Sequence, residues 1–595
     1  HNLRSLAHAE ALAQAAGLQP EAYEFQMLFG MAESIQTAVA KSARRVRIYA
    51  PIGELIPGMA YLVRRLLENT SNESFLRKEY SEKEPLNLLL TTPPQTISSP
   101  QIRGTGAASP SHTTVVPLDR FVNEPLTDFS HDAARSAMQG AIDCAKAQFG
   151  HRFSSAMTAA SPSGPELLSR NPSRPDQVIG RVQTCSPRDI ELALKSAQTR
   201  TFDWRSTTPD ARAEILIKAA ALMRRRRFDF AAWEIFETGK PWREADADVA
   251  EAIDFLEFYA KEMRRLGHPQ RLGHEPGELN ELFYSPRGVA AVIAPWNFPL
   301  AIPTGMVSAA LVTGNVVLFK PSERSSIIGV LLGDLLKDAG VPQGVLHVLP
   351  GGPDIGHTLA THPDVDVIAF TGSKDVGLRL LGLNTHMTVG QRVIKRVIAE
   401  MGGKNAMIID ETADLDEAVT GVVKSFTGYQ GQKCSACSRA VVHASVYDIF
   451  LRRLTDAVMS LHMGPPEDPS NVMGPMIDGR ALAKVQEYIE IGKQEGRVVA
   501  LGRKQEPGYF ITPTIVADIQ PTHRLAQEEI FGPVLAVMRA PDFQEALKMA
   551  NDSSYALTGG VYSRSPANIQ AARTQFDVGN LYINRPITGA LVNRQ

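Results

Sequence analysis

A cysteine in a polar, glycine-rich turn is the residue of this sequence best suited to covalent chemistry. Cys434 lies in GYQGQKCSACSR, residues 428–439, among glycine, glutamine and serine rather than inside an apolar run. A thiol in such surroundings can be exposed and reactive, although a single cysteine in a turn is more often structural. Cys437 completes a CxxC spacing, but the sequence has no second CxxC and no histidine pair nearby, so we expect no metal.

Five further motifs accompany the cysteine turn. They are IAPWNFP at 293–299, NVVLFKPSE at 315–323, VIAFTGSKDVG at 367–377, EMGGKN at 400–405 and EEIFGPV at 528–534. Short buried strands (VAAVIA, NVVLF and VDVIAF) precede or overlap three of them, and strands of this kind indicate a parallel sheet covered on both faces.

In order and separation, the six motifs resemble the aldehyde dehydrogenase superfamily over residues 121–595. The resemblance implies an α/β fold with a Rossmann-like parallel sheet for NAD and a second α/β catalytic domain. It also implies an enzyme that oxidises an aldehyde with NAD.

The resemblance assigns catalytic roles to three residues. Cys434 matches the family's nucleophile, and a thiolate attacks an aldehyde carbon readily. The side-chain amide of Asn297 and the backbone N–H of Cys434 match the oxyanion hole. Glu400 matches the general base that activates water against the thioester. The alternative for Glu400 is a surface carboxylate before a Gly-Gly turn.

A cofactor site follows from the same resemblance. Gly372 and Ser373 open a helix after a strand, and N–H groups at a helix N-terminus suit a pyrophosphate. A carboxylate at Glu323 accepts from free ribose hydroxyls and repels a 2′-phosphate, which favours NAD over NADP. Pro295 and Trp296 can equally be packing residues. The residues that match cofactor-binding positions are Ile293, Pro295, Trp296, Lys320, Glu323, Gly372, Ser373, Glu529 and Phe531.

The aldehyde's far end is expected to meet Ser435 and the loop NRPITGALV, residues 584–592. The hydroxyl of Ser435 and the backbone N–H groups of Gly589 and Ala590 form a small anion-binding nest, unless they are only turn formers. These residues resemble the carboxylate anchor of the 1-pyrroline-5-carboxylate dehydrogenases. The small-molecule substrate implied is glutamate γ-semialdehyde, which is oxidised to glutamate in proline catabolism.

The N-terminal stretch resembles the last strands and helix of a proline dehydrogenase barrel, a flavoenzyme domain that many bacteria fuse ahead of the aldehyde dehydrogenase. The matching segments are YEFQMLFGM at 23–31 and RIYAPIGELIPGMAYLVRRLLEN at 47–69. Arg64 and Arg65 match the pair that binds the proline carboxylate, Tyr49 matches a substrate-contacting tyrosine, and Glu68 lies near the flavin. Without the flanking motif, Arg64 and Glu68 would be read as a surface ion pair.

Both ends of the chain are expected to be truncated. A β/α barrel needs all eight strands, and only the last two or three are present, so FAD and proline oxidation are expected only in the intact parent protein. Family members also continue past Gln595 through a segment of the aldehyde pocket and a strand that joins a partner subunit. A homo-oligomer is therefore expected for the intact protein.

The changes in sequence pattern divide the chain into five regions. These are a remnant of the proline dehydrogenase barrel at 1–83, a Pro/Ser/Thr-rich linker at 84–120, an NAD-binding domain at 121–399, a catalytic domain at 400–554, and a return to the NAD-binding domain with the anchor loop at 555–595.

Composition excludes several other classes. A net charge of -2 gives no case for nucleic acid, and the run Arg224–Arg227 is expected to form a solvated helix face. Four cysteines are too few for a disulfide framework, and no apolar run is long enough for a membrane helix, which favours a cytoplasmic protein. The alternatives are a dehydrogenase of another carboxylated semialdehyde, such as succinate semialdehyde, and a non-catalytic scaffold with the same fold.

Overall fold

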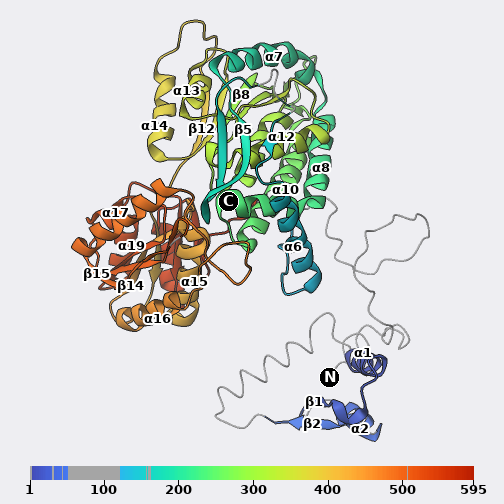
Figure 1. Ribbon diagram of the computed structural model, residues 1–595, viewed down its shortest axis with the longest axis vertical. Coiled ribbons are helices and arrows are strands. Elements are labelled where there is room, and N and C mark those ends of the chain that lie inside the picture. Colours follow the sequence, from blue (N-terminus) through green and yellow to red (C-terminus); the bar gives the residue numbers. More distant parts are fainter. Residues whose placement is uncertain are drawn as a thin grey trace. The chain divides into compact units, whose positions relative to one another are not determined.

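The computed structural model describes residues 3–29, 33–42, 45–50, 121–155, 157, 162–505 and 507–594. The chain forms two compact units, His1–Thr114 and Val115–Gln595. Each unit is described by itself below, and both are drawn in Figure 1.

The described part of the N-terminal unit alternates helices and strands. Its elements are α1 (Leu3–Ala15), η1 (Pro20–Ala22), β1 (Phe25–Leu28), α2 (Glu33–Lys41) and β2 (Val46–Tyr49). Strands β1 and β2 pair in parallel, which is consistent with the β/α pattern expected from the sequence. Tyr49 is exposed at the end of β2. The expected helix through Leu67, with Arg64, Arg65 and Glu68, lies outside the described residues.

The larger unit contains a five-stranded parallel sheet in the order β10-β9-β8-β11-β12. Its strands are β8 (Val289–Ile293), β9 (Val316–Lys320), β10 (Leu346–Val348), β11 (Val367–Thr371) and β12 (Arg396–Glu400). The helices α11 (Ala301–Val312), α12 (Ser326–Asp338), α13 (Pro353–Thr361) and α14 (Lys374–Gly382) alternate with these strands. All five residues of β9 are buried, as expected for a strand covered on both faces. The predicted parallel sheet is confirmed.

A layer of helices packs beside this sheet. It comprises α6 (Asp132–Ala147), α7 (Pro187–Ser206), α8 (Pro209–Arg225), α9 (Arg227–Thr238) and α10 (Trp242–Leu266). The long helix α10 packs against α8, α9 and α11, and its apolar residues enter the largest core cluster. A small sheet, β3-β5-β4, completes this half (β3 Arg152–Phe153, β4 Glu166–Asn171, β5 Arg174–Gln183).

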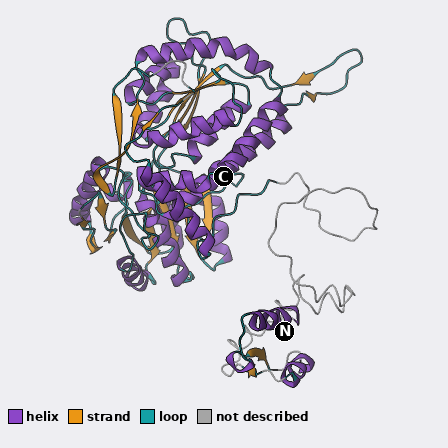
Figure 2. Cartoon of the chain, turned by 45° about the vertical axis from the view of Figure 1, so that its right-hand side comes forward, coloured by secondary structure: helices purple, strands orange, loops and turns teal. Residues whose placement is uncertain are grey.

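A second sheet has seven strands in the order β15-β18-β19-β14-β13-β20-β21, and only β15 is antiparallel. The strands are β13 (Asn405–Ile409), β14 (Cys437–His443), β15 (Arg497–Ala500), β18 (Thr514–Ala517), β19 (Val534–Ala540), β20 (Thr558–Tyr562) and β21 (Asn580–Ile583). The helices α15 (Leu415–Thr427), α16 (Tyr447–Met459), α17 (Gly479–Glu495), α19 (Phe543–Asn551) and α20 (Pro566–Gln575) belong to this half. Figure 2 shows helices (purple) packed around strands (orange) in the larger unit.

Strands β20 and β21 differ from the prediction that residues 555–595 return to the NAD-binding domain. Strand β20 pairs with β13, and β21 pairs with β20, so both extend the second sheet. Two glycines permit this packing, because a Cβ at Gly559 would lie 2.4 Å from the Phe576 ring and one at Gly560 would lie 2.5 Å from Ile587. The sequence of a short buried strand does not show which sheet the strand joins, and this explains why the prediction for residues 555–595 was wrong.

The two sheets present opposite strand ends to the predicted site. Motif residues follow the carboxyl ends of β8, β9, β11 and β12, where Ile293, Lys320, Thr371 and Glu400 end their strands. In the second sheet, Gly403, Cys434 and Phe531 instead precede the amino ends of β13, β14 and β19. Residues far apart in the sequence therefore converge between the two halves of this unit.

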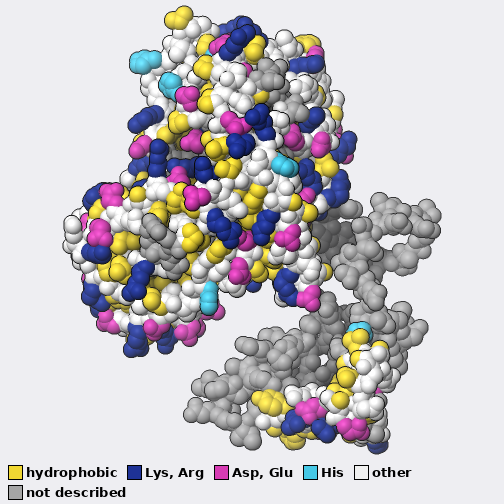
Figure 3. Space-filling view, viewed as in Figure 1, with side chains coloured by type: hydrophobic (Ala, Val, Ile, Leu, Met, Phe, Trp, Pro, Cys, Tyr) yellow, Lys and Arg dark blue, Asp and Glu magenta, His cyan; other side chains and the backbone are white. Residues whose placement is uncertain are grey.

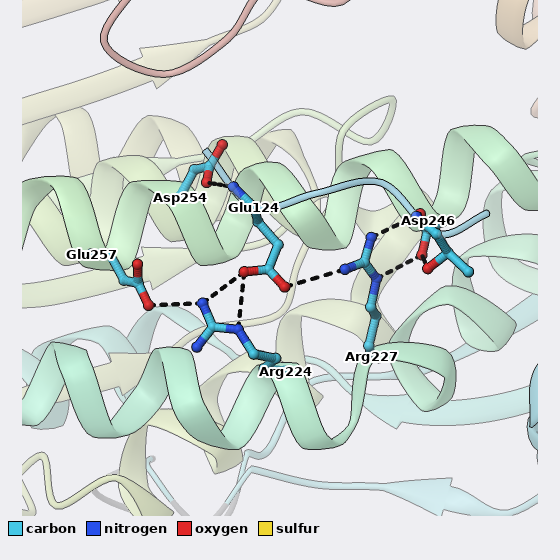
Figure 4. A network of polar contacts seen from close by, with 7 residues as sticks. Glu124, Arg224, Arg227, Asp246, Asp254 and Glu257 are labelled. Atoms are coloured by element: carbon cyan, nitrogen blue, oxygen red, sulfur yellow. Dashed lines mark hydrogen bonds and ion pairs between the residues drawn. The ribbon is translucent and has the colours of Figure 1, made fainter. Parts of the chain in front are cut away.

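The sequence predicted that the arginine run at the junction of α8 and α9 forms a solvated helix face. In the structure, two of these arginines are instead held in ion pairs. Arg224 pairs with Glu124 at 2.7 Å and with Glu257 at 2.8 Å, and Arg227 pairs with Asp246 at 2.6 Å (Figure 4). The side chain of Arg227 is only 11% exposed. Sequence periodicity could not reveal these partners because they lie on α10 and on the segment before α6.

On the face drawn in Figure 3, basic and acidic side chains are interspersed, and neither forms a patch of like charge. None of the described helices combines the length and apolarity that a bilayer span requires.

Candidate active site

A strained turn carries the predicted nucleophile. Tyr429, Gln430 and Gly431 have φ values of 48°, 55° and 68°, a left-handed conformation that is costly for the first two. Gln430 compensates by accepting from the backbone N–H of Gly474 at 3.0 Å and donating to the carbonyl of Pro475 at 2.7 Å. The Tyr429 hydroxyl donates to the carbonyl of Thr238 at 2.9 Å. These bonds fix the turn that leads into Cys434.

The Gly-Gly pair of EMGGKN lies against this turn and against a second motif. A Cβ at Gly403 would lie 2.4 Å from the carbonyl oxygen of Cys434, and one at Gly402 would lie 2.1 Å from Oε1 of Glu529. Asn405, two residues after Gly403, donates from Nδ2 to the carbonyl of Cys434 at 2.7 Å. Only glycine permits these close approaches, so the motif brings Cys434 and Glu529 together.

Two hydrogen-bond donors are available beside Cys434. Asn297 is 5% exposed, and its Nδ2 donates one proton to the carbonyl of Gln432 at 3.0 Å. This bond orients the amide, and its second proton remains available. Within the described part of the chain, the backbone N–H of Cys434 has no hydrogen-bond partner. The pair matches what an oxyanion hole requires. Nothing in the sequence pattern points to Gln432, whose carbonyl orients the amide.

Two cavities meet at Cys434, and Ile302, Thr371 and Met401 also line both of them. The first has a volume of about 730 Å³ and the second about 560 Å³. The predicted residues that line the first are Glu400, Ser435, Gly589 and Ala590. Those that line the second are Pro295, Trp296, Asn297, Glu323, Gly372, Ser373, Glu529 and Phe531.

Two predicted cofactor residues do not line the second cavity. Ile293 is the last residue of β8, and Lys320 is 5% exposed with its Nζ donating to the carbonyl of Pro321 at 3.1 Å. Burial lowers the pKa of Lys320, whereas the carboxylates of Glu323 and Asp354 act to raise it. Lys320 thus lies beneath Glu323, at the base of the turn that presents this carboxylate.

The second cavity offers the groups that a dinucleotide requires. Helix α14 begins directly after β11, and Ser373 caps it. Oε1 of Glu529 accepts from the backbone N–H of Gly403 at 2.9 Å, while Oε2 has no hydrogen-bond partner among the described residues and can accept from a ribose. Phe531, with φ 60°, places its ring centroid 5.6 Å from that of Trp296. Helix N–H groups, free carboxylate oxygens and an aromatic wall together fit NAD.

Electrostatics hold the Cys434 thiol in its protonated form. Burial raises the pKa of Cys434 to about 12, and the carboxylates of Glu529, Glu400 and Glu251 contribute in the same direction. Glu251, on α10, lines the first cavity. Burial and the neighbouring Asp248 raise the pKa of Glu251 to about 8. The thiolate is therefore a minor form until a positive charge enters the site.

Three hydrogen-bond donors that line the first cavity are unused in the part of the chain that the structure describes. The side chain of Ser435 and the backbone N–H groups of Gly589 and Ala590 make no hydrogen bond within the described residues. Gly589 has a φ of 77°, which turns the backbone between Thr588 and Ala590. Three free donors and the half-buried carboxylate of Glu251 thus line one cavity with Cys434. The sequence did not reveal Glu251, because it lies in a helix without any motif.

Comparison with known families agrees with this geometry. Residues 159–594 match the aldehyde dehydrogenase family, and residues 1–78 match proline dehydrogenase. The chain belongs to the aldehyde dehydrogenase family. Its α/β fold with parallel sheets is the one that the sequence predicted from its six motifs.

Several relatives are similar over most of this aldehyde dehydrogenase chain. It is 46% identical to the 1-pyrroline-5-carboxylate dehydrogenase of Geobacillus thermodenitrificans, over 80% of this chain and 93% of that protein. Identity to the enzyme of the same name from Bacillus subtilis is 43%, over the same shares.

Solved structures give the same picture. A Thermus 1-pyrroline-5-carboxylate dehydrogenase with bound NAD aligns with a TM-score of 0.78 and 44% identity, over 81% of this chain and 94% of that one. Proline utilization A from Bdellovibrio bacteriovorus aligns with a TM-score of 0.83 and 45% identity. This chain is covered completely in that alignment but spans only 61% of the Bdellovibrio protein.

Proposed function

We propose that this chain oxidises L-glutamate γ-semialdehyde, the open form of 1-pyrroline-5-carboxylate, to L-glutamate with NAD. The observation that carries the proposal is the first cavity, where Cys434 shares the wall with three unused donors and with the carboxylates of Glu251 and Glu400. The relatives named 1-pyrroline-5-carboxylate dehydrogenase, and the NAD in one of their structures, support the same substrate and cofactor.

The first step is attack by Cys434. Its thiol loses a proton to a water molecule, a carbon–sulfur bond forms with the aldehyde carbon, and the carbonyl oxygen becomes an oxyanion. Nδ2 of Asn297 and the backbone N–H of Cys434 donate to that oxygen, which lowers the energy of the transition state. Glu323, Glu529 and Phe531 would hold NAD in the second cavity, where it would supply the hydride acceptor for the oxidation. Loss of the hydride from the same carbon leaves a thioester on Cys434.

The second step is hydrolysis, and Glu400 is the proposed base. Glu400 ends β12 and lines the first cavity beside Cys434, where a water molecule can reach the thioester. Its carboxylate takes a proton from the water, the water oxygen adds to the carbonyl carbon, and the carbon–sulfur bond breaks. Cys434 leaves as a thiolate and glutamate is released.

The proposed substrate differs from the alternative, succinate semialdehyde, because it carries two charged groups that the site can recognise. The α-carboxylate is assigned to the donors of Ser435, Gly589 and Ala590, and the α-ammonium is assigned to Glu251. A carboxyl group whose pKa is raised to about 8 gains most from a cationic partner, because the partner favours its charged form. Succinate semialdehyde has no ammonium group, so it offers Glu251 no cationic partner and gains nothing from it.

The test compares kcat/KM for glutamate γ-semialdehyde, succinate semialdehyde and an uncharged aldehyde of similar length, for the chain and its Glu251→Gln and Ser435→Ala variants. The proposal expects glutamate γ-semialdehyde to be preferred. Its preference over succinate semialdehyde should fall in Glu251→Gln, and its preference over the uncharged aldehyde should fall in both variants. A preference for succinate semialdehyde that is unchanged in Glu251→Gln would favour the rival substrate instead.

Three further assignments extend beyond this activity. For a longer parent protein we propose a FAD-dependent proline-oxidising domain, since residues 1–78 match proline dehydrogenase. A homo-oligomer and a cytoplasmic location are also proposed, on the family resemblance and the cysteine content respectively. Gel filtration and cell fractionation of the intact protein would test both.

A further inference from the structure

The loop that carries Gly589 and Ala590 is held at two points. On one side the backbone N–H of Ile587, a fully buried residue, donates to Oγ of Ser425 in α15 at 3.1 Å. On the other side the carbonyl of Val592, which is 3% exposed, accepts from Nδ2 of Asn123 at 3.0 Å. The proposed carboxylate donors lie between these two anchors, so each anchor limits where the donors can move.

Asn123 also reaches α10, a helix whose residues Glu251 and Phe255 line the same cavity. Its Nδ2 donates to Oδ2 of Asp254 in α10 at 2.8 Å, and Asp254 is 4% exposed. The backbone N–H of Glu124 donates to the other oxygen of the same carboxylate at 2.5 Å. Both donors of the Asn123 amide are thereby used, one on the helix and one on the loop.

The hydrogen bonds that Asn123 makes to Asp254 and Val592 matter because of where Asp254 lies on α10. Asp254 lies three residues after Glu251, a spacing that places two side chains on the same face of a helix. Its charge is close enough to raise the pKa of Glu251. One amide therefore connects the helix that carries the proposed ammonium partner with the loop that carries the proposed carboxylate donors.

Neighbouring ion pairs prevent Asn123 from shifting freely. Glu124 pairs with Arg224 and Arg227, as Figure 4 shows, and Thr127 donates to Asp246 from both its backbone N–H at 2.8 Å and its hydroxyl at 2.6 Å. Asp246, like Asp254, belongs to α10. The segment before α6 is thus fixed along the length of α10, and Asn123 is its contact with the loop.

We propose that Asn123 is a positioning residue that sets the spacing between the carboxylate-binding loop and α10, and so determines affinity for an aldehyde carrying an α-amino acid group. The inference rests on the proposed function. It does not make Asn123 catalytic, since Asn123 contacts the loop and the helix and lines neither cavity at Cys434.

The experiment measures KM and kcat for glutamate γ-semialdehyde and for an uncharged aldehyde of similar length, in the full chain and in Asn123→Ala. Asn123→Ala removes both hydrogen bonds of the amide, and loss of the one that anchors the loop should raise KM for glutamate γ-semialdehyde about three- to tenfold. The kcat for both aldehydes, and KM for the uncharged one, should change by less than about twofold, since the loop touches only the charged end.

Two further variants make the result specific. Asn123→Asp keeps the size of the side chain but cannot donate, and it brings a second carboxylate against Asp254, so its KM should rise at least as much. Thr127→Ala removes a contact to α10 from the same segment without touching the loop, so its KM should stay at the wild-type value. Thermal unfolding of each variant checks that it folds.

The outcomes are distinct. A wild-type chain without preference for glutamate γ-semialdehyde would overturn the proposed function, and this inference with it. A wild-type preference that persists with unchanged KM in Asn123→Ala and Asn123→Asp would overturn the inference alone. It would also be overturned if KM rose equally for both aldehydes, or if Thr127→Ala behaved as Asn123→Ala does, since either result would indicate a purely structural role.

Discussion

Adding one methyl group at Gly403 should disable the nucleophile without affecting cofactor affinity. The new Cβ would lie 2.4 Å from the carbonyl oxygen of Cys434 and 2.7 and 2.8 Å from the side-chain amide of Asn405. Ordinary contact begins at 3.4 Å, so the neighbours must move by about 1 Å. Neither can yield easily, because one is backbone and the other already donates to the carbonyls of Cys434 and Ala436.

The strain therefore moves the backbone of Cys434. A misplacement of about 1 Å in a reacting group can cost about 100-fold in rate, equivalent to about 2.7 kcal/mol of transition-state stabilisation. We expect kcat of Gly403→Ala, measured as NADH formation with 1-pyrroline-5-carboxylate, to fall by about this factor. KM for NAD should stay close to the wild-type value.

Gly402→Ala is the matched control, because it adds the same methyl group one residue earlier. Its Cβ would lie 2.1 Å from Oε1 of Glu529, a proposed ribose-binding carboxylate, so KM for NAD should rise more than kcat falls. The reasoning would be refuted if Gly403→Ala kept kcat within about threefold, or if the two variants shifted the same parameter. Cooperative thermal unfolding of both would exclude a general loss of structure.

Three other predictions follow from the site. Asn297→Ala, which removes one of the two oxyanion donors, should lower kcat by about 100- to 1000-fold with little change in KM; a loss below about tenfold in steady-state assays would argue against that role. Glu251→Gln removes one of the carboxylates that raise the pKa of Cys434, so iodoacetamide should alkylate Cys434 about threefold faster at a constant pH of about 9, where Glu251 is mostly charged, and slower alkylation would contradict this sign. In the chain without NAD, alkylation of Cys434 should accelerate steadily from about pH 7 to 10, because a thiol with a pKa of about 12 is still mostly protonated there; a plateau near pH 8 would show that the pKa is lower.

Much of the fold and the candidate site was predictable because chemistry-bearing residues lie at strand ends. Strands β8, β9 and β11 begin and end within two residues of the predicted runs, so the turns that follow them were placed correctly. Parallel strands bring their carboxyl ends to one edge of a sheet, and this alone gathers Glu323, Gly372 and Glu400.

Contacts between residues that are far apart in the sequence were not predictable. The amphipathic pattern of α10 shows which face is buried but not what that face meets, so Glu251 and Asp254 carried no signal. The burial of Arg227 and the sheet joined by β20 escaped prediction for the same reason. A bridge such as that from Asn123 to Val592 joins residues too far apart in sequence for any local pattern to show.

The central claim is that Cys434 carries the acyl group, and one measurement tests it directly. Intact-protein and peptide mass spectrometry of the Glu400→Gln variant, mixed with NAD and 1-pyrroline-5-carboxylate, should detect one acyl adduct on the peptide that contains Cys434. The adduct should be absent without NAD and absent in Cys434→Ala, which should also form no NADH. An adduct on another residue, or NADH formation that survives loss of Cys434, would contradict the account.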